Sequence, residues 1–515
     1  RPWCLVRPPG QNAFAGFPWY DENTISQRRK DRFMDYETVI GLEIHVELQT
    51  EEKIFCSCPT TFGALENSQI CPVCRGLPGA RPVLNPQVVN FALRLCLATG
   101  CRIDPMSRFD RKFYDYPDLP KGYQITQWFQ PIGREGSVRL THQPSRVIRI
   151  REIHMEEDTA RLTEDPESGG IQIDYNRCGV PLLEIVTQPE LSSAEEAIDL
   201  ITTLREMVLF LGISDGRMEQ GSLRVDVNIS VRRKGDQTLG VRTEMKNLSS
   251  LKAISRAIRH ESQRQIKRLQ AGKIIRPATR RWDEKRQESR ALRSKEMAAD
   301  YRYDPEPDLP PVHLEAARIE AIRARLPEMA SVKRKRYVGQ LGIRPEDASL
   351  LTSSPALSAQ FEALTDQGTA PADAAGWLLG EFLQICRRQG CTPAKITLPP
   401  GNLAWIIRQV ENGRITRMSG RRTLEAVMAD NVDPQDYIEI HQLAIQTDQD
   451  QIQRWIDEVL RQYPGALRDY FRGRTKARVF IMGQVMRLSG GRADPALSAR
   501  LLEQTLASLS DSQRQ

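Results

Sequence analysis

The sequence predicts an α+β fold, in which a domain built on an antiparallel sheet is followed by all-helical middle and C-terminal tail domains. Short alternating segments with Gly, Pro and Asp turns fill the chain from about Tyr36 to Pro311, with helical patterns among them. After the proline-dense segment YRYDPEPDLPPV nearly every stretch has helical spacing. We therefore expect a sheet domain over 34–313, a helical domain over 314–400 and a helical tail domain over 401–515.

Residues 1–33 form an extension outside this pattern. They contain no apolar core before a small-residue cleavage site, so they are not typical of a secretory signal. Asp21, Glu22 and Asp31 weaken a transit-peptide interpretation. We expect a disordered extension or an over-called start, in a bacterial-type cytoplasmic protein, or in an organellar one if the extension is a transit peptide.

The composition is that of an ordinary globular protein with room for roughly two to four domains. No run of about 18 apolar residues is present, so we expect no membrane role. The net charge of +7 favours a polyanionic partner, although charge alone does not identify nucleic acid. The ten cysteines are too sparse for a disulfide scaffold and suit a reducing compartment.

The segment GLEIHVEL (41–48) alternates strictly between apolar and polar side chains. Because strand side chains project to opposite faces with a period of two, we expect a strand whose apolar face lies on a core. Glu43, His45 and Glu47 then share the other face. An exposed polar face is the ordinary interpretation, and this segment alone leaves it open.

SLRVDVNISV predicts a second strand with a polar face, which carries Arg224, Asp226 and Asn228. Between the two strands, AEEAIDLITTLREMVLFLGI has apolar residues at helical spacing. Its glycine, Gly212, is placed to end that helix.

Four of the cysteines have the spacing C-x-C-x12-C-x2-C, which is a zinc-knuckle pattern. Four thiolates in two close pairs can surround one zinc ion tetrahedrally. They leave no open position for a substrate, so we expect the zinc to be structural. The four ligands are Cys56, Cys58, Cys71 and Cys74.

A second acidic cluster lies in IHMEEDTARL, which contains His154, Glu156, Glu157 and Asp158. Further along, Glu184 stands inside the apolar run GVPLLEIV. An ionised carboxylate that is buried without a partner is costly, so Glu184 must meet a cation, a metal or hydrogen-bond donors. A salt bridge to an arginine is the simplest of these partners.

Magnesium is the alternative partner, because Mg²⁺ prefers oxygen ligands and binds nucleotide phosphates. The carboxylates of both acidic segments could hold it together with the Glu43 and His45 face. A direct His45 ligand would fit Mn²⁺ better, or the imidazole lies in the outer coordination sphere.

Several motifs are absent from the sequence. It has no GxxxxGK[ST], so ATP would not be bound through a P-loop, and it has no GxSxG of esterase-like nucleophiles. Ser249 and Lys252 match SxxK in form, but the companion motifs are missing and we expect no catalytic role.

Three basic stretches are candidates for RNA contacts or for solvated surface charge: SVKRKRY, RRWDEKRQESRALRSK and RDYFRGRTKARVF. In the last, four cations from Arg472 to Arg478 lie beside Tyr470 and Phe471. That composition suits phosphate contacts and stacking on RNA.

Eight motifs in order resemble the B subunit of the aspartyl/glutamyl-tRNA amidotransferase family: YETVIGLEIHVEL, FCSC with CPVC, FDRKFYDYPDLPKGYQIT, IHMEEDTARL, DYNRCGVPLLEIV, SDGRMEQGSLRVDVNISV, EMKNL and DYRYDPEPDLPP. The resemblance runs from Tyr36 to the C-terminus and is densest up to Pro311. Asp304 stands where the family usually has Phe, and Ser249 and Leu251 replace the Asn and Phe expected after KNL. These departures affect local packing and no acidic residue.

The resemblance implies a cradle-like catalytic domain that amidates Glu-tRNA(Gln), Asp-tRNA(Asn) or both, giving Gln-tRNA(Gln) and Asn-tRNA(Asn). It implies a heterotrimer with an amidase A subunit, which supplies ammonia from glutamine, and a small C subunit. ATP would phosphorylate the side-chain carboxylate, because an acyl phosphate has a good leaving group and a carboxylate does not. The helical domains would hold the tRNA.

The resemblance also implies the site residues. The magnesium set would be Glu43, His45, Glu157 and Glu184, with the catalytic Glu156 nearby. The pocket for the nucleotide and the aminoacyl end would contain the other catalytic residues, which are Lys112 and Arg224, both also binding ATP, and Asp226, Asn228, Glu244 and Lys246.

Two alternatives belong to other functional classes. One is a zinc-containing, RNA-binding scaffold subunit whose acidic face is structural. The other is a free-standing ATP-dependent amide ligase that needs no partner chain.

Overall fold

The computed structural model describes residues 36–514 except 115, 166–167, 295–300 and 397, so the extension expected at residues 1–33 lies outside the described residues. Two compact units are present. The first contains the described residues up to Leu326 apart from Leu209–Leu211, and the second contains the rest. No helix in the described ranges combines the length and the apolar character needed to cross a bilayer.

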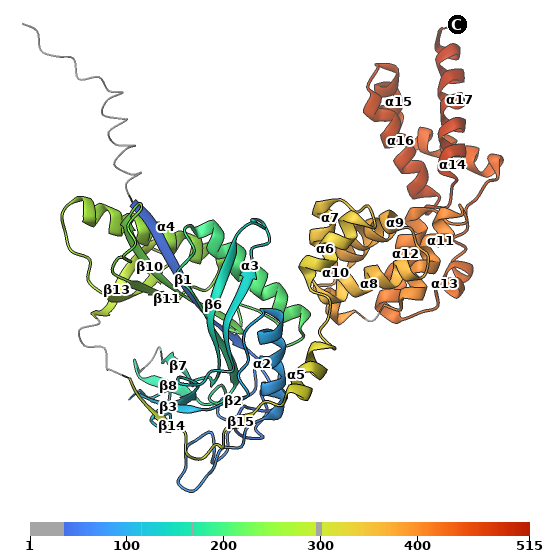
Figure 1. Ribbon diagram of the computed structural model, residues 1–515. Helices are drawn as coiled ribbons and strands as arrows, with labels where there is room; N and C mark the ends of the chain where they lie inside the picture. Colours follow the sequence, from blue (N-terminus) through green and yellow to red (C-terminus); the bar gives the residue numbers. More distant parts are fainter. Residues whose placement is uncertain (1–35, 115, 166–167, 295–300, 397, 515) are drawn as a thin grey trace, which may run out of the picture. The chain divides into compact units, whose positions relative to one another are not determined.

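An eight-stranded sheet forms the centre of the first unit (Figure 1). Its strands are antiparallel neighbours except for the parallel pair of β11 and β12. In spatial order they are β13 (Glu288–Ser294), β12 (Ala278–Asp283), β11 (Thr243–Lys246), β10 (Leu223–Arg233), β1 (Tyr36–Glu47), β9 (Pro181–Thr187), β6 (Val147–Glu157) and β5 (Gly133–Arg139).

The two central strands have the alternation that the sequence predicts. Leu42, Ile44 and Val46 of β1 are buried, and so are Val225 and Val227 of β10. The intervening polar residues of both strands are only partly buried. The apolar face therefore lies on a core, and the polar face is available for chemistry.

Three long helices belong to this unit: α2 (Pro86–Ala98), α3 (Ala194–Phe210) and α4 (Leu251–Gln270). The helix α3 ends before Gly212, whose φ of 63° lies in the left-handed region, as the sequence predicts. Ser250 caps α4 by accepting a hydrogen bond from the N–H of Ala253 at 3.1 Å. The SxxK sequence therefore lies at a helix start, where the neighbouring serine has a capping role.

Smaller sheets complete the first unit (Figure 1). One contains β14 (Arg302–Pro305), β3 (Asp110–Phe113) and β4 (Tyr123–Thr126), and we call it the small sheet. The others pair β15 (Val312–His313) with β2 (Met106–Ser107), and β7 (Arg161–Glu164) with β8 (Ile171–Asp174).

The first unit extends past the expected boundary at residue 313. The short helix α5 (Ala316–Arg323) belongs to it. Arg318 of α5 donates a hydrogen bond to the side-chain oxygen of Asn90 in α2, at 2.7 Å. The helical pattern therefore begins before the change of unit, because this helix packs on the sheet domain.

In its described part the second unit is helical. Proline occupies the first helical turn of seven of the α-helices described in this unit, where its missing N–H is not needed. The helices are α6 (Ala330–Gly339), α7 (Pro345–Leu351), α8 (Pro355–Asp366), α9 (Pro371–Trp377), the π-helical turn η2 (Leu378–Phe382), α10 (Leu383–Arg388), the 3₁₀ turn η3 (Pro393–Lys395), α11 (Pro400–Glu411), α12 (Arg417–Asp430), α13 (Pro434–Ile440), α14 (Gln449–Gln462), α15 (Pro464–Phe471), α16 (Thr475–Leu488) and α17 (Pro495–Arg514).

The expected boundary at residue 400 does not separate the hydrophobic cores of this unit. Leu403, Ile406 and Ile407 of α11 are buried in the same core as Phe361 of α8. A second core begins with Ile452 of α14 and includes residues of α16 and α17. The proline-rich stretch before α11 thus lies between helices that share one core, and the core that begins with Ile452 follows about fifty residues later.

Candidate functional site

The polar face of the large sheet gathers charged side chains from adjacent strands. The antiparallel register pairs Glu43 of β1 with Asp226 of β10, and His45 with Arg224. On its other side β1 pairs with β9, which places His45 opposite Glu184. Directly paired residues project to the same face, so the register alone brings these groups together.

His45, Glu156 and Glu184 form the first of two compact groups. One ligand atom from each lies within 4.8 Å of the others. The Nε2 atom of His45 is 3.4 Å from a carboxylate oxygen of Glu156 and 3.9 Å from one of Glu184. The hydroxyl of Thr126, from the small sheet, donates to the other oxygen of Glu156 at 3.3 Å.

The electrostatics of this group suit a cation. Burial, followed by the charge of Glu184, raises the pKa of Glu156 to about 8. Burial also raises the pKa of Glu184, and the charge of Glu43 contributes to the rise. Removal from water lowers the pKa of His45 well below its ordinary value, so the imidazole is neutral at pH 7. A neutral imidazole beside one buried and one partly buried carboxylate is a donor set for a divalent cation.

Glu43 belongs to the second group, together with Asp226 and Glu244. Asn228 donates from its side-chain amide to Glu43 at 2.9 Å. Lys246 donates to Asp226 at 2.6 Å, and its ammonium lies 3.0 Å from Glu244. The lysine already supplies a positive charge here, so the second group is a hydrogen-bonded charge network.

Lys112 and Arg224 belong to different sheets, and the charges of both act on Glu156 of the first group. Arg224, on the large sheet, has its guanidinium 2.9 Å from the carboxylate of Asp158. Lys112 comes from the small sheet; burial opposes its charge, but the carboxylates of Glu156 and Glu184 nevertheless raise its pKa. Both cations are therefore charged, and both face the carboxylates.

Glu157 is not in either group, in contrast to the expected magnesium set. Side chains alternate along β6, so Glu157 projects away from Glu156. Both of its carboxylate oxygens accept hydrogen bonds from the ammonium of Lys121, and the N–H of Ile125 donates to one of them at 2.8 Å. The structure therefore places Glu156, and not Glu157, beside His45.

Glu184 has no arginine partner among the described residues. Its basic neighbour within 4 Å there is the imidazole of His45, at 3.9 Å. The structure thus does not provide the salt bridge to arginine that the sequence left open.

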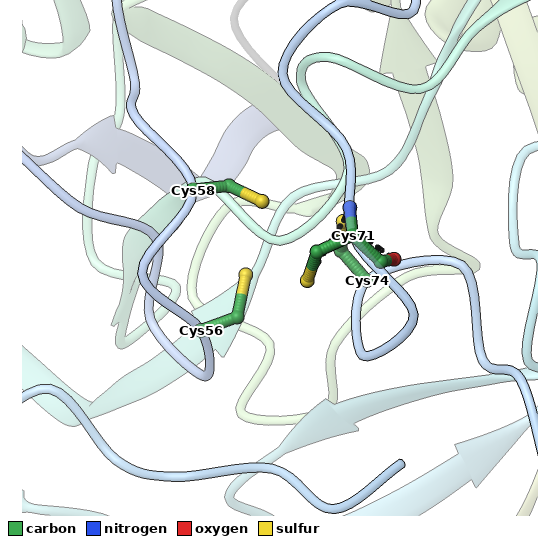
Figure 2. Close-up of side chains that lie close together, drawn as sticks. All are labelled: Cys56, Cys58, Cys71 and Cys74. Atoms are coloured by element: carbon green, nitrogen blue, oxygen red, sulfur yellow. Dashed lines mark hydrogen bonds between the residues drawn. The ribbon is translucent and has the colours of Figure 1, made fainter.

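The four expected cysteines lie together at a separate site. Figure 2 shows Cys56 and Cys58 on one loop facing Cys71 and Cys74 on another. One sulfur from each lies within 4.8 Å of the others, and the Sγ atoms of Cys71 and Cys74 are 3.9 Å apart. Zinc–sulfur bonds of about 2.3 Å in a tetrahedron require sulfurs roughly 3.8 Å apart. The cluster therefore fits one zinc ion.

The loop after Cys74 contacts Lys121, the ion-pair partner of Glu157. A Cβ atom added at Gly76, whose φ is 66°, would lie 2.5 Å from Cγ of Lys121. This loop therefore packs directly on Lys121, whose ammonium binds the carboxylate of Glu157 in β6. Sequence reasoning missed Lys121: it lies in the motif KGYQIT, but its spacing carries no signal of its partner.

Several cations of the basic stretches have acidic partners. Lys333 and Arg336 in SVKRKRY form ion pairs with Glu362. In the last stretch, Arg474 and Arg478 pair with acidic residues, whereas the described residues include no acidic partner of Arg472 or Lys476. Solvated or paired surface charge accounts for SVKRKRY, and Arg472 and Lys476 stay available for phosphate.

Comparisons with known proteins cover both units. A family described as the GatB/GatE catalytic domain matches residues 38–320, and one described as the GatB domain matches residues 359–506. These two matches correspond to the sheet-containing unit and to most of the helical unit.

Several curated relatives are similar over most of the chain. Proteins named as the B subunit of aspartyl/glutamyl-tRNA(Asn/Gln) amidotransferase are 43% identical in Lachnoclostridium phytofermentans, 44% in Agathobacter rectalis and 43% in Thermosynechococcus vestitus. Each alignment covers 92% of this chain and 99%, 100% and 97% of the respective relative.

Proposed function

Because this chain belongs to the B-subunit family of aspartyl/glutamyl-tRNA(Asn/Gln) amidotransferases, we propose that it activates the side-chain carboxylate of mischarged Glu-tRNA(Gln), Asp-tRNA(Asn) or both. The product would be Gln-tRNA(Gln) or Asn-tRNA(Asn). Activation consists of phosphoryl transfer from ATP to the carboxylate. Ammonia then attacks the acyl phosphate, and inorganic phosphate leaves.

The group of His45, Glu156 and Glu184 is the observation that carries this proposal. Its oxygen and imidazole donors fit Mg²⁺, or Mn²⁺ if the imidazole binds directly. Such an ion would neutralise phosphate charge and align the transfer. Glu43 lies close enough to Glu184 to raise its pKa, and we place it at the edge of this group.

Two cations next to the group would bind the anionic substrates. Lys112 from the small sheet and Arg224 from the large sheet both face the carboxylates. We propose that they hold the phosphates of ATP and stabilise the charge that spreads over the transferred phosphoryl group. Asn228 and Lys246 would fix the acidic side chains next to them, as their hydrogen bonds to Glu43 and Asp226 indicate.

Ammonia requires a partner in this scheme. The relatives are named as the B subunit of the amidotransferase, which indicates a complex of several chains. We propose a heterotrimer with a glutaminase A subunit and a small C subunit, with ammonia delivered from the first to the acyl phosphate. The Cys56–Cys74 loops would hold a structural zinc ion, and the helical unit would bind the body of the tRNA, with Arg472 and Lys476 as available phosphate contacts.

Phosphate release from ATP by the reconstituted complex tests the proposal. Release should require Glu-tRNA(Gln) or Asp-tRNA(Asn) and should fall at least a hundredfold in Glu184→Gln, while tRNA binding persists. Glu190→Gln is the matched control, because Glu190 forms an exposed ion pair with Arg149 away from the acidic group. A scaffold subunit would release phosphate equally well with either substitution, and a free-standing ligase would need no partner subunits.

A further inference from the structure

Aromatic side chains border the acidic group along one face of the small sheet. The strand register makes Tyr303 of β14, Lys112 of β3 and Gln124 of β4 cross-strand neighbours on that face. Gln124 donates from its side chain to the backbone oxygen of Glu157 at 2.8 Å. The face that carries these residues is therefore turned toward the end of β6, where the acidic group lies.

Two pairs of rings flank Lys112. The ring of Tyr303 stacks on the indole of Trp128, with centroids 4.3 Å apart and planes inclined by 15°. The ammonium of Lys112 lies 4.9 Å from the ring centroid of Tyr301, which packs edge-on against Tyr114 at 5.7 Å. The lysine thus lies beside aromatic rings as well as beside carboxylates.

The indole of Trp128 is exposed, although hydrogen bonds fix the backbone that carries it. Trp128 is 48% exposed although one of its faces is covered by Tyr303, and Phe129 is 54% exposed. The backbone N–H groups of both residues donate to one carboxylate oxygen of Asp110, at 2.7 and 3.0 Å, and Asp110 is 2% exposed. A buried carboxylate therefore fixes the turn that presents these two rings to solvent.

We propose that Trp128 and Tyr303 form a stacking site for an adenine ring, supplied by ATP or by the 3′-terminal adenosine of the bound tRNA. This inference rests on the proposed function, in which both molecules must reach the acidic group. An exposed π face accepts any base, and stacking on it contributes to affinity without base-specific hydrogen bonds. The ammonium of Lys112 next to the rings favours an occupant that carries phosphate over an apolar protein surface.

The chemistry of an adenine nucleotide also limits where its base and its phosphates can lie. A base on Trp128 would leave the sugar and phosphates directed along the small sheet toward Lys112 and Glu156. Phosphates then meet a cation, and the acidic group stays free for a metal ion.

Ligand binding to the reconstituted complex tests the stacking site in the variants Trp128→Ala and Trp128→Phe. The control is Phe62→Ala, which removes another exposed ring of the same unit; Phe62 is 71% exposed. The probes are ATP, inorganic tripolyphosphate, tRNA(Gln) and tRNA(Gln) trimmed of its terminal adenosine. If ATP supplies the adenine, Trp128→Ala weakens ATP binding about tenfold and leaves tripolyphosphate unaffected. If the tRNA supplies it, the loss appears with intact tRNA and not with trimmed tRNA. In either arm Trp128→Phe retains most of the affinity.

Two results would overturn the inference. Unchanged affinity of Trp128→Ala for both ATP and intact tRNA would exclude a stacking site. Loss of the partner subunits from the Trp128→Ala complex, with ligand affinities retained, would identify the rings as a protein contact. The wild-type complex separates this inference from the proposed function, since tRNA-dependent phosphate release tests that function whatever Trp128 does.

Discussion

The ion pair between Lys121 and Glu157 should be among the most sensitive points of the first unit. Lys121→Met removes the ammonium and keeps most of the side-chain volume. The side chain of Glu157 is 2% exposed, and among the described residues it would keep the hydrogen bond from the N–H of Ile125, at 2.8 Å. A carboxylate would thus be left in the interior without its cation.

The structure sets the expected size of this effect. Removing one partner of a buried ion pair typically costs about 3–5 kcal/mol, because the remaining charge stays desolvated. Replacing both partners by neutral groups removes that penalty, so Lys121→Met/Glu157→Gln should be more stable than Lys121→Met alone. Arg149→Met is the matched control: the side chain of Arg149 in its pair with Glu190 is exposed, so we expect a much smaller loss of stability than in Lys121→Met.

Native-state hydrogen exchange of the full chain, resolved to peptides from β4 and β6, measures the opening of this region directly. A loss of less than about 1 kcal/mol in Lys121→Met, or a double variant no more stable than the single one, would refute the reasoning. A single Glu157→Gln variant examines Glu157 as a metal ligand: loss of Mg²⁺-dependent phosphate release by its complex, with unchanged exchange, would favour the metal set that the family resemblance implies.

Three further outcomes follow from the structure. Elemental analysis should find zinc in the wild-type chain and in Cys391→Ser, a substitution in the helical unit, but not in Cys58→Ser, whose cysteine loops should also become sensitive to protease; equal zinc contents would exclude the four-cysteine site. Deletion of residues 448–515 should weaken tRNA binding at least tenfold in filter assays and leave the core around Phe361 folded, and unchanged affinity would place the tRNA elsewhere. Ser250→Ala should lower the unfolding free energy by about 1 kcal/mol in urea titrations, and a change near zero would mean that the cap contributes nothing.

Local patterns in the sequence were sufficient for the elements that carry the site. The alternation in β1 and β10 identified their polar faces, and the helix before Gly212 ends where the glycine indicated. The cysteine spacing identified four residues whose sulfur atoms come together. These signals are local, because strand period, helix capping and metal-ligand spacing all act over a few residues.

The boundaries between units could be predicted less well from the sequence. Two proline-rich stretches, near residues 313 and 400, predicted breaks between units. In the structure, α5 belongs to the same unit as the sheet domain, and α11 packs in the same hydrophobic core as α8. Proline ends a helix wherever it occurs, whereas a unit ends where buried contacts end, so prolines alone could not locate the change of unit.

By itself, the sequence determined which side chains face away from the core on each strand, the presence of a four-cysteine cluster and the family. Only the tertiary structure decided which carboxylates share a site, because that depends on the register between strands far apart in the chain. The register placed Glu156 and Glu184 beside His45, and it placed Glu43 beside Asp226. Glu156 and Glu157 are adjacent in sequence, yet one joins the acidic group and the other pairs with Lys121, because consecutive residues of a strand project to opposite faces of the sheet.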